Sequence, residues 1–179
     1  MQNDIARVLL STEEIALKVK ELGERITQDY AGEKLLVVGI LKGSNMFMSD
    51  LIRHIDMPMQ MDFMMVSSYG NATESTGVVK IIKDLEQGIQ DKHVLIIEDI
   101  IDTGLTLKYL TQILETRNPA SVKLCTLIDK PARRKETVAV DYIGFEMPDE
   151  FIVGYGIDYA EHYRNLPFVG VLKPEIYEK

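Results

Sequence analysis

Three carboxylates lie close together between Val94 and Thr106, directly before a small polar loop. Glu98 and Asp99 follow an apolar run, and Asp102 opens the sequence Asp-Thr-Gly-Leu-Thr. The backbone N–H groups of such a loop, together with the N-terminus of a following helix, can hold a phosphate. The carboxylates could hold a divalent cation, bind sugar hydroxyls or move a proton. An anion site beside three acids indicates a ligand-binding or catalytic role for this stretch.

The loop also has a plain structural explanation. Asp102 or Thr103 could be the N-cap of the helix expected over residues 107–116. Gly104 would let the backbone approach a ligand closely. The loop is not a P-loop, because no Gly-Lys-Ser/Thr follows the glycine, and it lacks the Gly-x-Gly-x-x-Gly dinucleotide fingerprint. The upstream acids favour the functional explanation over the helix cap.

The apolar periodicity around this stretch predicts alternating strands and helices. Short continuous apolar runs are typical of strands buried on both faces of a parallel sheet. Ser11 and Glu14 form a capping-box pattern at the start of the first helix. The predicted helices cover residues 11–30, 46–55 and 107–116, and the predicted strands cover 35–41, 59–67, 78–82, 94–99, 121–128, 138–145 and 168–172.

This alternation predicts an α/β fold with a mainly parallel central sheet flanked by helices. We expect one domain over residues 1–179, with a core of about 34–145. The less regular segments of about 1–30 and 146–179 are expected to form a small cap, or hood, over the end of the sheet.

Unusual polar residues follow several of the predicted strands. Ligands of open α/β sheets bind beyond the carboxyl ends of the strands, so these residues should converge. The polar stretch from residue 67 to 77 is either an active-site lid or a plain surface hairpin loop. The strand ends in question are Lys42-Gly43, Ser67-Ser68-Tyr69, Glu98-Asp99 and Asp129-Lys130.

Composition narrows the class of protein. The 179 residues carry 20 Lys and Arg against 28 Asp and Glu, a net charge of -8. An acidic chain is a poor general binder of nucleic acid or of an anionic membrane. Cys125 is the only cysteine, so the sequence offers no internal disulfide. The N-terminus lacks a signal-peptide pattern and no apolar run is long enough to span a bilayer, so we expect a cytoplasmic protein.

The stretch from Val94 to Thr106 resembles the phosphoribosyl-pyrophosphate (PRPP) signature of type I phosphoribosyltransferases, with an apolar run, two acids, two aliphatic residues and Asp-Thr-Gly-x-Thr. The rest of the chain is similar nearly end to end to the hypoxanthine-guanine branch of that family, of bacterial type. The residues that carry this resemblance, in the family's order, are Leu41-Lys42-Gly43, Ser67-Ser68-Tyr69-Gly70, Asp129-Lys130 and the motif from Phe145 to Tyr159.

The resemblance implies a purine-salvage enzyme that transfers 5-phosphoribose from PRPP to hypoxanthine or guanine, with Mg²⁺. Asp102 would be the general base that takes a proton from the purine. Glu98 and Asp99 would contact the ribose hydroxyls directly or through magnesium, and Asp158 would help to hold a second magnesium ion. The 5′-phosphate would be bound by the loop residues Asp102, Thr103, Gly104, Leu105 and Thr106. Some relatives carry a lysine where this chain has Leu105, so only the backbone N–H can serve there.

The family pattern also implies a pyrophosphate site and a lid. The Lys42–Gly43 peptide would bind pyrophosphate and would be a non-proline cis peptide, and Arg164 would meet the same group. Ser68 and Tyr69 would lie on a lid that closes during the reaction.

The base site would lie elsewhere in the sequence. Lys130 would donate to the O6 acceptor of the purine, which opposes adenine because adenine carries an amino group there. Phe151 would stack on the base, and the Ile152 backbone would meet its edge. Without the resemblance, Lys130 would be taken as a solvated lysine at a strand end and Phe151 as a core aromatic.

Two other functions remain open at this point. The chain could be a regulator that keeps the phosphoribosyltransferase fold and binds nucleic acid, although its acidity opposes this. It could also be a sibling enzyme that prefers xanthine or adenine. The family usually forms homodimers or homotetramers, and we expect one of these. The run Arg133-Arg134-Lys135 is interpreted as a solvated face or a subunit contact.

Overall fold

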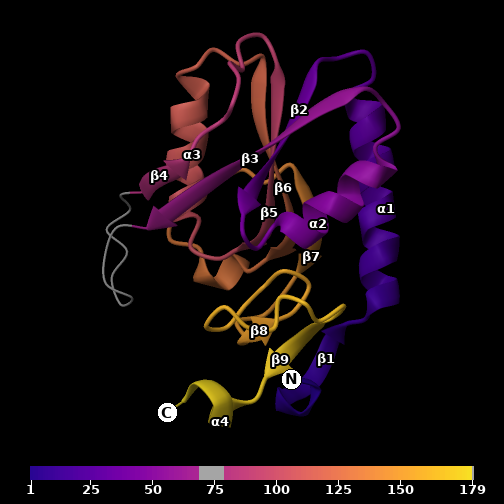
Figure 1. Cartoon of the computed structure of the whole chain (residues 1–179), viewed down its shortest axis with the longest axis vertical. Helices are drawn as coiled ribbons and strands as arrows, with labels where there is room; N and C mark the ends of the chain where they lie inside the picture. Colours follow the sequence, from indigo (N-terminus) through magenta and orange to yellow (C-terminus); the bar gives the residue numbers. More distant parts are fainter. Residues whose placement is uncertain (69–78, 179) are drawn as a thin grey trace.

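The computed structural model describes residues 1–68 and 79–178 and shows a mixed α/β protein (Figure 1). Its helices are α1 (Thr12–Asp29), α2 (Asn45–Leu51), α3 (Leu105–Glu115) and α4 (Pro174–Tyr177), with 3-10 turns η1 (Gln2–Asp4), η2 (Ile52–His54) and η3 (Pro131–Arg133). Its strands are β1 (Ile5–Leu10), β2 (Leu35–Leu41), β3 (Met59–Ser68), β4 (Val79–Lys83), β5 (His93–Ile101), β6 (Ser121–Asp129), β7 (Tyr142–Glu146), β8 (Ile152–Val153) and β9 (Val169–Leu172).

The central sheet has six strands in the order β4-β3-β2-β5-β6-β7. All neighbouring pairs are parallel except β3 with β4. Helices α1 and α2 cover one face and α3 covers the other, as Figure 1 shows. The predicted mainly parallel sheet with helices on both faces is confirmed, and β5, which carries the acids, lies between β2 and β6.

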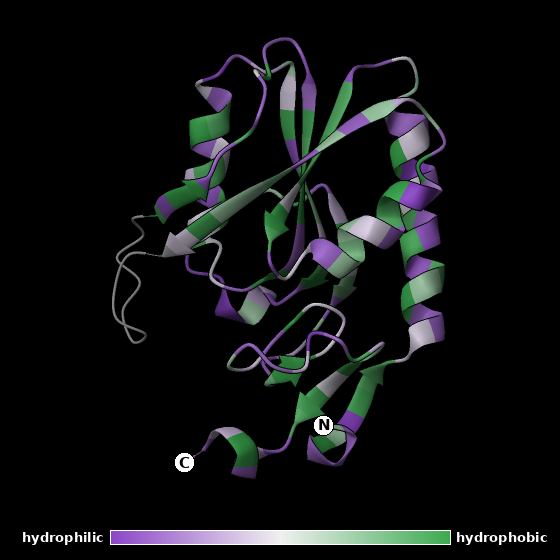
Figure 2. Ribbon diagram, in the orientation of Figure 1, coloured by the Kyte–Doolittle hydropathy of each residue, from purple (hydrophilic) through white to green (hydrophobic). Residues whose placement is uncertain are grey.

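Helix α1 forms where the sequence predicts it. The Ser11 hydroxyl accepts the Glu14 N–H, and the Glu14 carboxylate accepts the Ser11 N–H, which completes the capping box. Figure 2 shows alternating hydrophobic and hydrophilic bands along the helix. Its apolar stripe packs against the central sheet and consists of Ile15, Val19, Leu22 and Ile26.

A second, three-stranded sheet joins the two ends of the chain. Its order is β1-β9-β8, with both pairs antiparallel. In Figure 1 it lies beyond the carboxyl ends of the central strands, the place expected for the hood. The hood boundaries of about 1–30 and 146–179 stay a proposal. Within them β1, β8 and β9 form the small sheet, whereas α1 packs on the central sheet.

Several predicted boundaries are wrong. The strand expected from residue 138 begins at Tyr142, because Val138 and Val140 pack on the apolar cluster beneath α3 without pairing to β6. Strand β5 continues past the acids to Ile101, because β6 runs alongside it as far as Asp129. Helix α3 begins two residues earlier than predicted. The sequence interpretation also missed β1 and α4.

None of the helices in residues 1–68 and 79–178 is both long and apolar enough to cross a membrane.

Candidate active site

Glu98 and Asp99 lie near the end of β5, next to the loop that follows β2. Asp99 is 8% exposed, and its Oδ1 accepts the Ile100 N–H at 2.8 Å. A Cβ placed on Gly43 would lie 1.8 Å from Asp99 Oδ2. Gly43 therefore lies directly against the Asp99 carboxylate, and a side chain at position 43 would require that carboxylate or the loop to shift.

Burial governs the charge of this acidic pair. Loss of hydration and then repulsion by Asp99 raise the pKa of Glu98 well above its ordinary value. Burial also raises the pKa of Asp99, opposed by the Ile100 N–H and by the nearby Arg164 charge. A cation bound between these two acids would favour their ionised forms and oppose both shifts.

The loop after β5 presents backbone N–H groups to a small cavity. Gly104 has φ of 80° and is the N-cap of α3, and no side chain caps that helix. The interpretation of Asp102 or Thr103 as an ordinary helix N-cap is therefore wrong. A cavity of about 180 Å³ is lined by Glu98, Ile100, Ile101, Asp102, Thr103, Gly104, Thr106 and Leu107. An anion bound there would face free N–H groups and the positive end of α3.

Asp102 faces a cation that the sequence interpretation missed. Arg133 Nε lies 2.9 Å from Asp102 Oδ1, and Arg133 Nη1 lies 3.1 Å from Asp149 Oδ1. Asp102 Oδ1 is buried, and Arg133 is its charged partner. Arg134 pairs with Asp129. The Arg133 side chain is 48% exposed and that of Arg134 is 17% exposed, so the predicted solvated face is confirmed for Arg133 and wrong for Arg134, and the subunit contact stays a prediction.

Lys130 is buried, not solvated. It is 6% exposed, and its Nζ donates to the Glu150 carbonyl at 2.5 Å. Burial lowers the pKa of Lys130, and the Asp102 and Asp149 charges oppose this shift. Phe151, the residue after Glu150, is 39% exposed and is therefore not a core aromatic. Lys130, Phe151 and Asp102 thus surround one region between the central and small sheets.

The β2 loop meets the turn before Arg164. A Cβ on Gly156, whose φ is 101°, would lie 2.1 Å from the Gly43 carbonyl oxygen. Arg164 donates to the Gly156 carbonyl at 2.8 Å and pairs with Asp158 at 2.8 Å. Arg164 Nε is buried and lacks a partner among residues 1–68 and 79–178. The β2 loop therefore contacts the turn at Gly156, and the Arg164 guanidinium is bound to the same turn.

One backbone prediction at this loop is wrong in position. The cis peptide bond joins Leu41 and Lys42, not Lys42 and Gly43. Leu41 is the last residue of β2. The Lys42 ammonium lies 2.7 Å from Glu161, an acid that the sequence interpretation did not single out.

Some of the remaining predicted site residues are described by the structure and others are not. Ile152 is buried in β8 directly after Phe151. Ser68 ends β3, while Tyr69 and the rest of the predicted lid up to residue 77 lie outside the described residues. Within the described part of the chain, no three His, Cys, Asp or Glu side chains form a metal-binding group. Magnesium often binds one or two carboxylates together with phosphates of a ligand.

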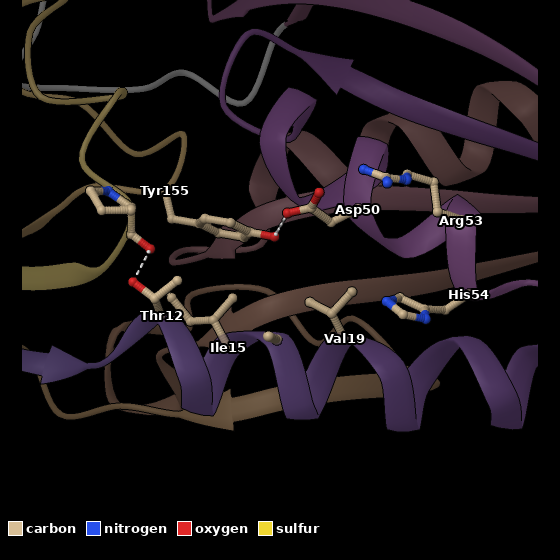
Figure 3. Close-up of a pocket in the computed structure, with 9 residues that line it drawn as sticks. Thr12, Ile15, Val19, Asp50, Arg53, His54 and Tyr155 are labelled. Atoms are coloured by element: carbon tan, nitrogen blue, oxygen red, sulfur yellow. Dashed lines mark hydrogen bonds between the residues drawn. The ribbon is translucent and has the colours of Figure 1, made fainter.

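A second cavity, of about 340 Å³, lies between α1 and α2 (Figure 3). Ile15 and Val19 form its apolar wall, and the Tyr155 hydroxyl donates to Asp50 at 2.6 Å. None of the predicted site residues lines it. The Tyr155–Asp50 bond joins α2 to the turn that carries Gly156, and Gly156 in turn packs against Gly43 of the β2 loop.

Comparison with known proteins gives the same assignment over almost the whole chain. Residues 7–160 match the phosphoribosyl transferase domain family. The chain is 57% identical over 178 residues to the "Hypoxanthine-guanine phosphoribosyltransferase" of Bacillus subtilis, covering 99% of both. It is 56% identical over 179 residues to the "Bifunctional protein TilS/HprT" of Listeria innocua, of which it covers 28%.

A solved structure agrees with these sequence matches. The crystal structure of a hypoxanthine phosphoribosyltransferase from Staphylococcus aureus superposes with a TM-score of 0.98 at 56% identity, covering 100% of this chain and 97% of that one. Fold, strand-end residues and sequence similarity all agree with the signature between Val94 and Thr106. The chain belongs to the phosphoribosyltransferase family.

Proposed function

We propose that this chain transfers 5-phosphoribose from PRPP to hypoxanthine and guanine, forming IMP and GMP and releasing pyrophosphate. The observation that carries the proposal is the cavity in which Glu98 and Asp102 share a wall with the loop up to Thr106. Relatives that match nearly the full chain at 57% identity bear the name of this activity.

The sugar-phosphate end of PRPP would lie along β5 and the start of α3. The N–H groups of Thr103, Gly104, Leu105 and Thr106 lie at the N-terminus of α3 and suit the 5′-phosphate, which would replace the 3.5 Å bond from the Leu105 N–H to Thr103 Oγ1. Glu98 and Asp99 would hold the ribose hydroxyls or a Mg²⁺ ion. Carboxylate oxygens are ligands that Mg²⁺ prefers. The ion would also offset the burial and repulsion that raise the pKa of Glu98.

The pyrophosphate would lie between the β2 loop and Arg164. The contact of Gly43 with Gly156, and the unpartnered Arg164 Nε, support a shared oxyanion site at Lys42, Gly43 and Arg164. Bound magnesium, held by Glu98, Asp99 and Asp158, would neutralise charge that develops on the leaving group.

The purine would lie between the loop of Asp102 and the small sheet. The Lys130 ammonium would exchange the Glu150 carbonyl for O6 of the base, and Phe151 would stack on the ring. The edge of the base would meet the Ile152 backbone. Adenine presents a donor at that position and would leave the buried ammonium unpaired, so adenine should be rejected.

Asp102 would take the proton that the base loses. As N9 forms a bond with the anomeric carbon, the bond from that carbon to pyrophosphate breaks, and the base must release one proton. Asp102 lines the cavity of the loop after β5, and a carboxylate at that position suits a general base. Arg133 would hold the carboxylate in place.

A base panel tests the proposal. The chain is incubated with PRPP, Mg²⁺ and hypoxanthine, guanine, xanthine or adenine, and nucleotide and pyrophosphate are quantified. Hypoxanthine and guanine should each give nucleotide and pyrophosphate in equal amounts, and adenine should give neither. No product from either of the first two bases would refute the proposal. Product from xanthine alone would point to the sibling activity.

Two further properties belong to this proposal. The family resemblance supports a homodimer or homotetramer, which size-exclusion chromatography with light scattering measures directly. The setting we propose is the cytoplasm, where the single thiol, Cys125, would stay reduced.

A further inference from the structure

An aromatic ring of the C-terminal helix covers one face of Phe151. The rings of Phe151 and Tyr177 are stacked, with centroids 4.3 Å apart and planes inclined by 13°. Tyr159 contacts the edge of Phe151, with centroids 5.5 Å apart and planes inclined by 82°. Offset stacking and edge-to-face contact are the favoured geometries of aromatic pairs. Phe151 is thus held by two tyrosines although it lies at the surface.

Phe151 keeps surface that neither tyrosine covers. The residue is still 39% exposed with Tyr177 stacked on its ring and Tyr159 at the ring edge. Lys130, which comes from the central sheet, bonds to the carbonyl of the preceding residue, Glu150. Figure 1 shows α4 at the end of the molecule away from the central sheet. In that view β8, the strand that follows Phe151, lies between α4, which carries Tyr177, and the central sheet, whose strand β6 is followed by Lys130.

The position of Tyr177 is fixed by the fold of the small sheet. The Leu172 N–H donates to the Phe151 carbonyl at 2.9 Å, and the Lys173 N–H donates to the Asp4 carbonyl at 2.9 Å. Ile176 and Tyr177 pack on the apolar cluster that contains Leu172. The α4 segment is thus anchored close to Phe151 by backbone bonds and apolar contacts.

We infer that Tyr177 is a positioning residue that holds the Phe151 ring in the orientation that stacks on a purine. This inference rests on the proposed function. Tyr177 does not touch the base, because Phe151 lies between them. It restricts the Phe151 side chain before the base binds, so less ordering is needed on binding. Its effect should therefore fall on the affinity for the base and not on PRPP.

Steady-state kinetics of the full chain test this inference. Tyr177→Ala should raise the KM for hypoxanthine about three- to tenfold, the range expected for loss of one aromatic pair. The kcat and the KM for PRPP should stay within about twofold, because Tyr177 contacts neither the loop after β5 nor the β2 loop. Tyr177→Phe keeps the stacked ring and should behave as the unmodified chain.

Two further variants separate ring stacking from general damage to α4. Ile176→Ala removes an apolar anchor of the same helix and should leave the KM for hypoxanthine within about twofold. In a Phe151→Ala background, Tyr177→Ala should add no further increase, because its effect passes through Phe151.

The opposing results are distinct. An unchanged KM for hypoxanthine in Tyr177→Ala overturns the inference, and so does an equal increase in Ile176→Ala. A lower KM would mean that Tyr177 covers the base-facing side of Phe151, which also overturns it. If the unmodified chain transfers to neither hypoxanthine nor guanine, the proposed function fails and the inference fails with it.

Discussion

At the level of single residues, burial shapes the acid–base properties of Glu98 and Asp99 on β5. Burial raises the pKa of Glu98 and of Asp99, and repulsion by Asp99 raises the pKa of Glu98 further. In the unfolded chain both side chains would ionise at ordinary acidic pH. Folding therefore costs stability at these positions, and the ligand regains it on binding.

Glu98→Gln should stabilise the free chain at neutral pH. The folded pKa of Glu98 is raised, so its contribution to stability is present at low pH and is lost as pH rises through the folded pKa. The amide removes this loss, and we expect a higher melting temperature at pH 7 and a flatter dependence on pH between 5 and 8. Thermal unfolding with the exposed Glu115→Gln as control measures it; a lower melting temperature for Glu98→Gln would contradict the account.

At the scale of elements, the site depends on how closely the β2 loop approaches β5. The parallel pairing of β2 with β5 brings Gly43 against Asp99, and the turn at Gly156 lies against the other side of Gly43. Side chains at these two glycines would separate three segments that must act together. The close approach, and not the flexibility of glycine, explains the residue at position 43.

Gly43→Ala should impair PRPP use more than it impairs folding. The added Cβ would lie 1.8 Å from Asp99 Oδ2, so the carboxylate or the loop must shift. We expect the KM for PRPP to rise about tenfold or more, and the free energy of unfolding to fall by about 1–3 kcal/mol. Gly88→Ala is the control, because nothing lies within 4 Å of its added Cβ. Equal KM values in the two variants would show that the approach is unimportant.

The sequence predicted these elements where one physical signal dominates. Buried parallel strands such as β2 carry continuous apolar runs, and α1 carries a capping box, so both are confirmed within a residue or two. The ion pair of Arg133 with Asp102 was not predicted, because nothing in a basic run indicates that η3 will turn this side chain toward Asp102. Strand β1 was missed because its residues pair with β9, which lies more than 150 residues away in the chain.

At the scale of the whole molecule, the site lies where two sheets made from distant parts of the chain meet. The central sheet supplies Asp102 and Lys130, and the small sheet supplies Phe151. Strand β1 ends at Leu10, which is 4% exposed and packs in the same apolar cluster as α1 and the central sheet. The small sheet should therefore unfold together with the core.

Leu10→Ala should destabilise the entire chain and not the small sheet alone. Removing a buried leucine side chain costs about 2–5 kcal/mol. We expect one unfolding transition in urea, moved to lower denaturant, by both fluorescence and circular dichroism. Val8→Ala on the same strand is the control, because Val8 is 52% exposed and its loss should cost less than about 0.5 kcal/mol. Two separate transitions in Leu10→Ala would show that the small sheet folds independently.

In the proposed reaction the loop from Asp102 to Thr106 both holds the phosphate and moves the proton, with Asp102 as the base. Asp102→Asn keeps the shape of the loop and removes the proton acceptor, with Asp84→Asn, whose carboxylate also pairs with an arginine, as control. The most direct test is to measure turnover and PRPP affinity on this variant. If Asp102 is the base, the turnover of Asp102→Asn with hypoxanthine should fall about 10²- to 10⁴-fold, while its Kd for PRPP should change by less than about threefold. Turnover within about threefold of the unmodified chain would contradict it.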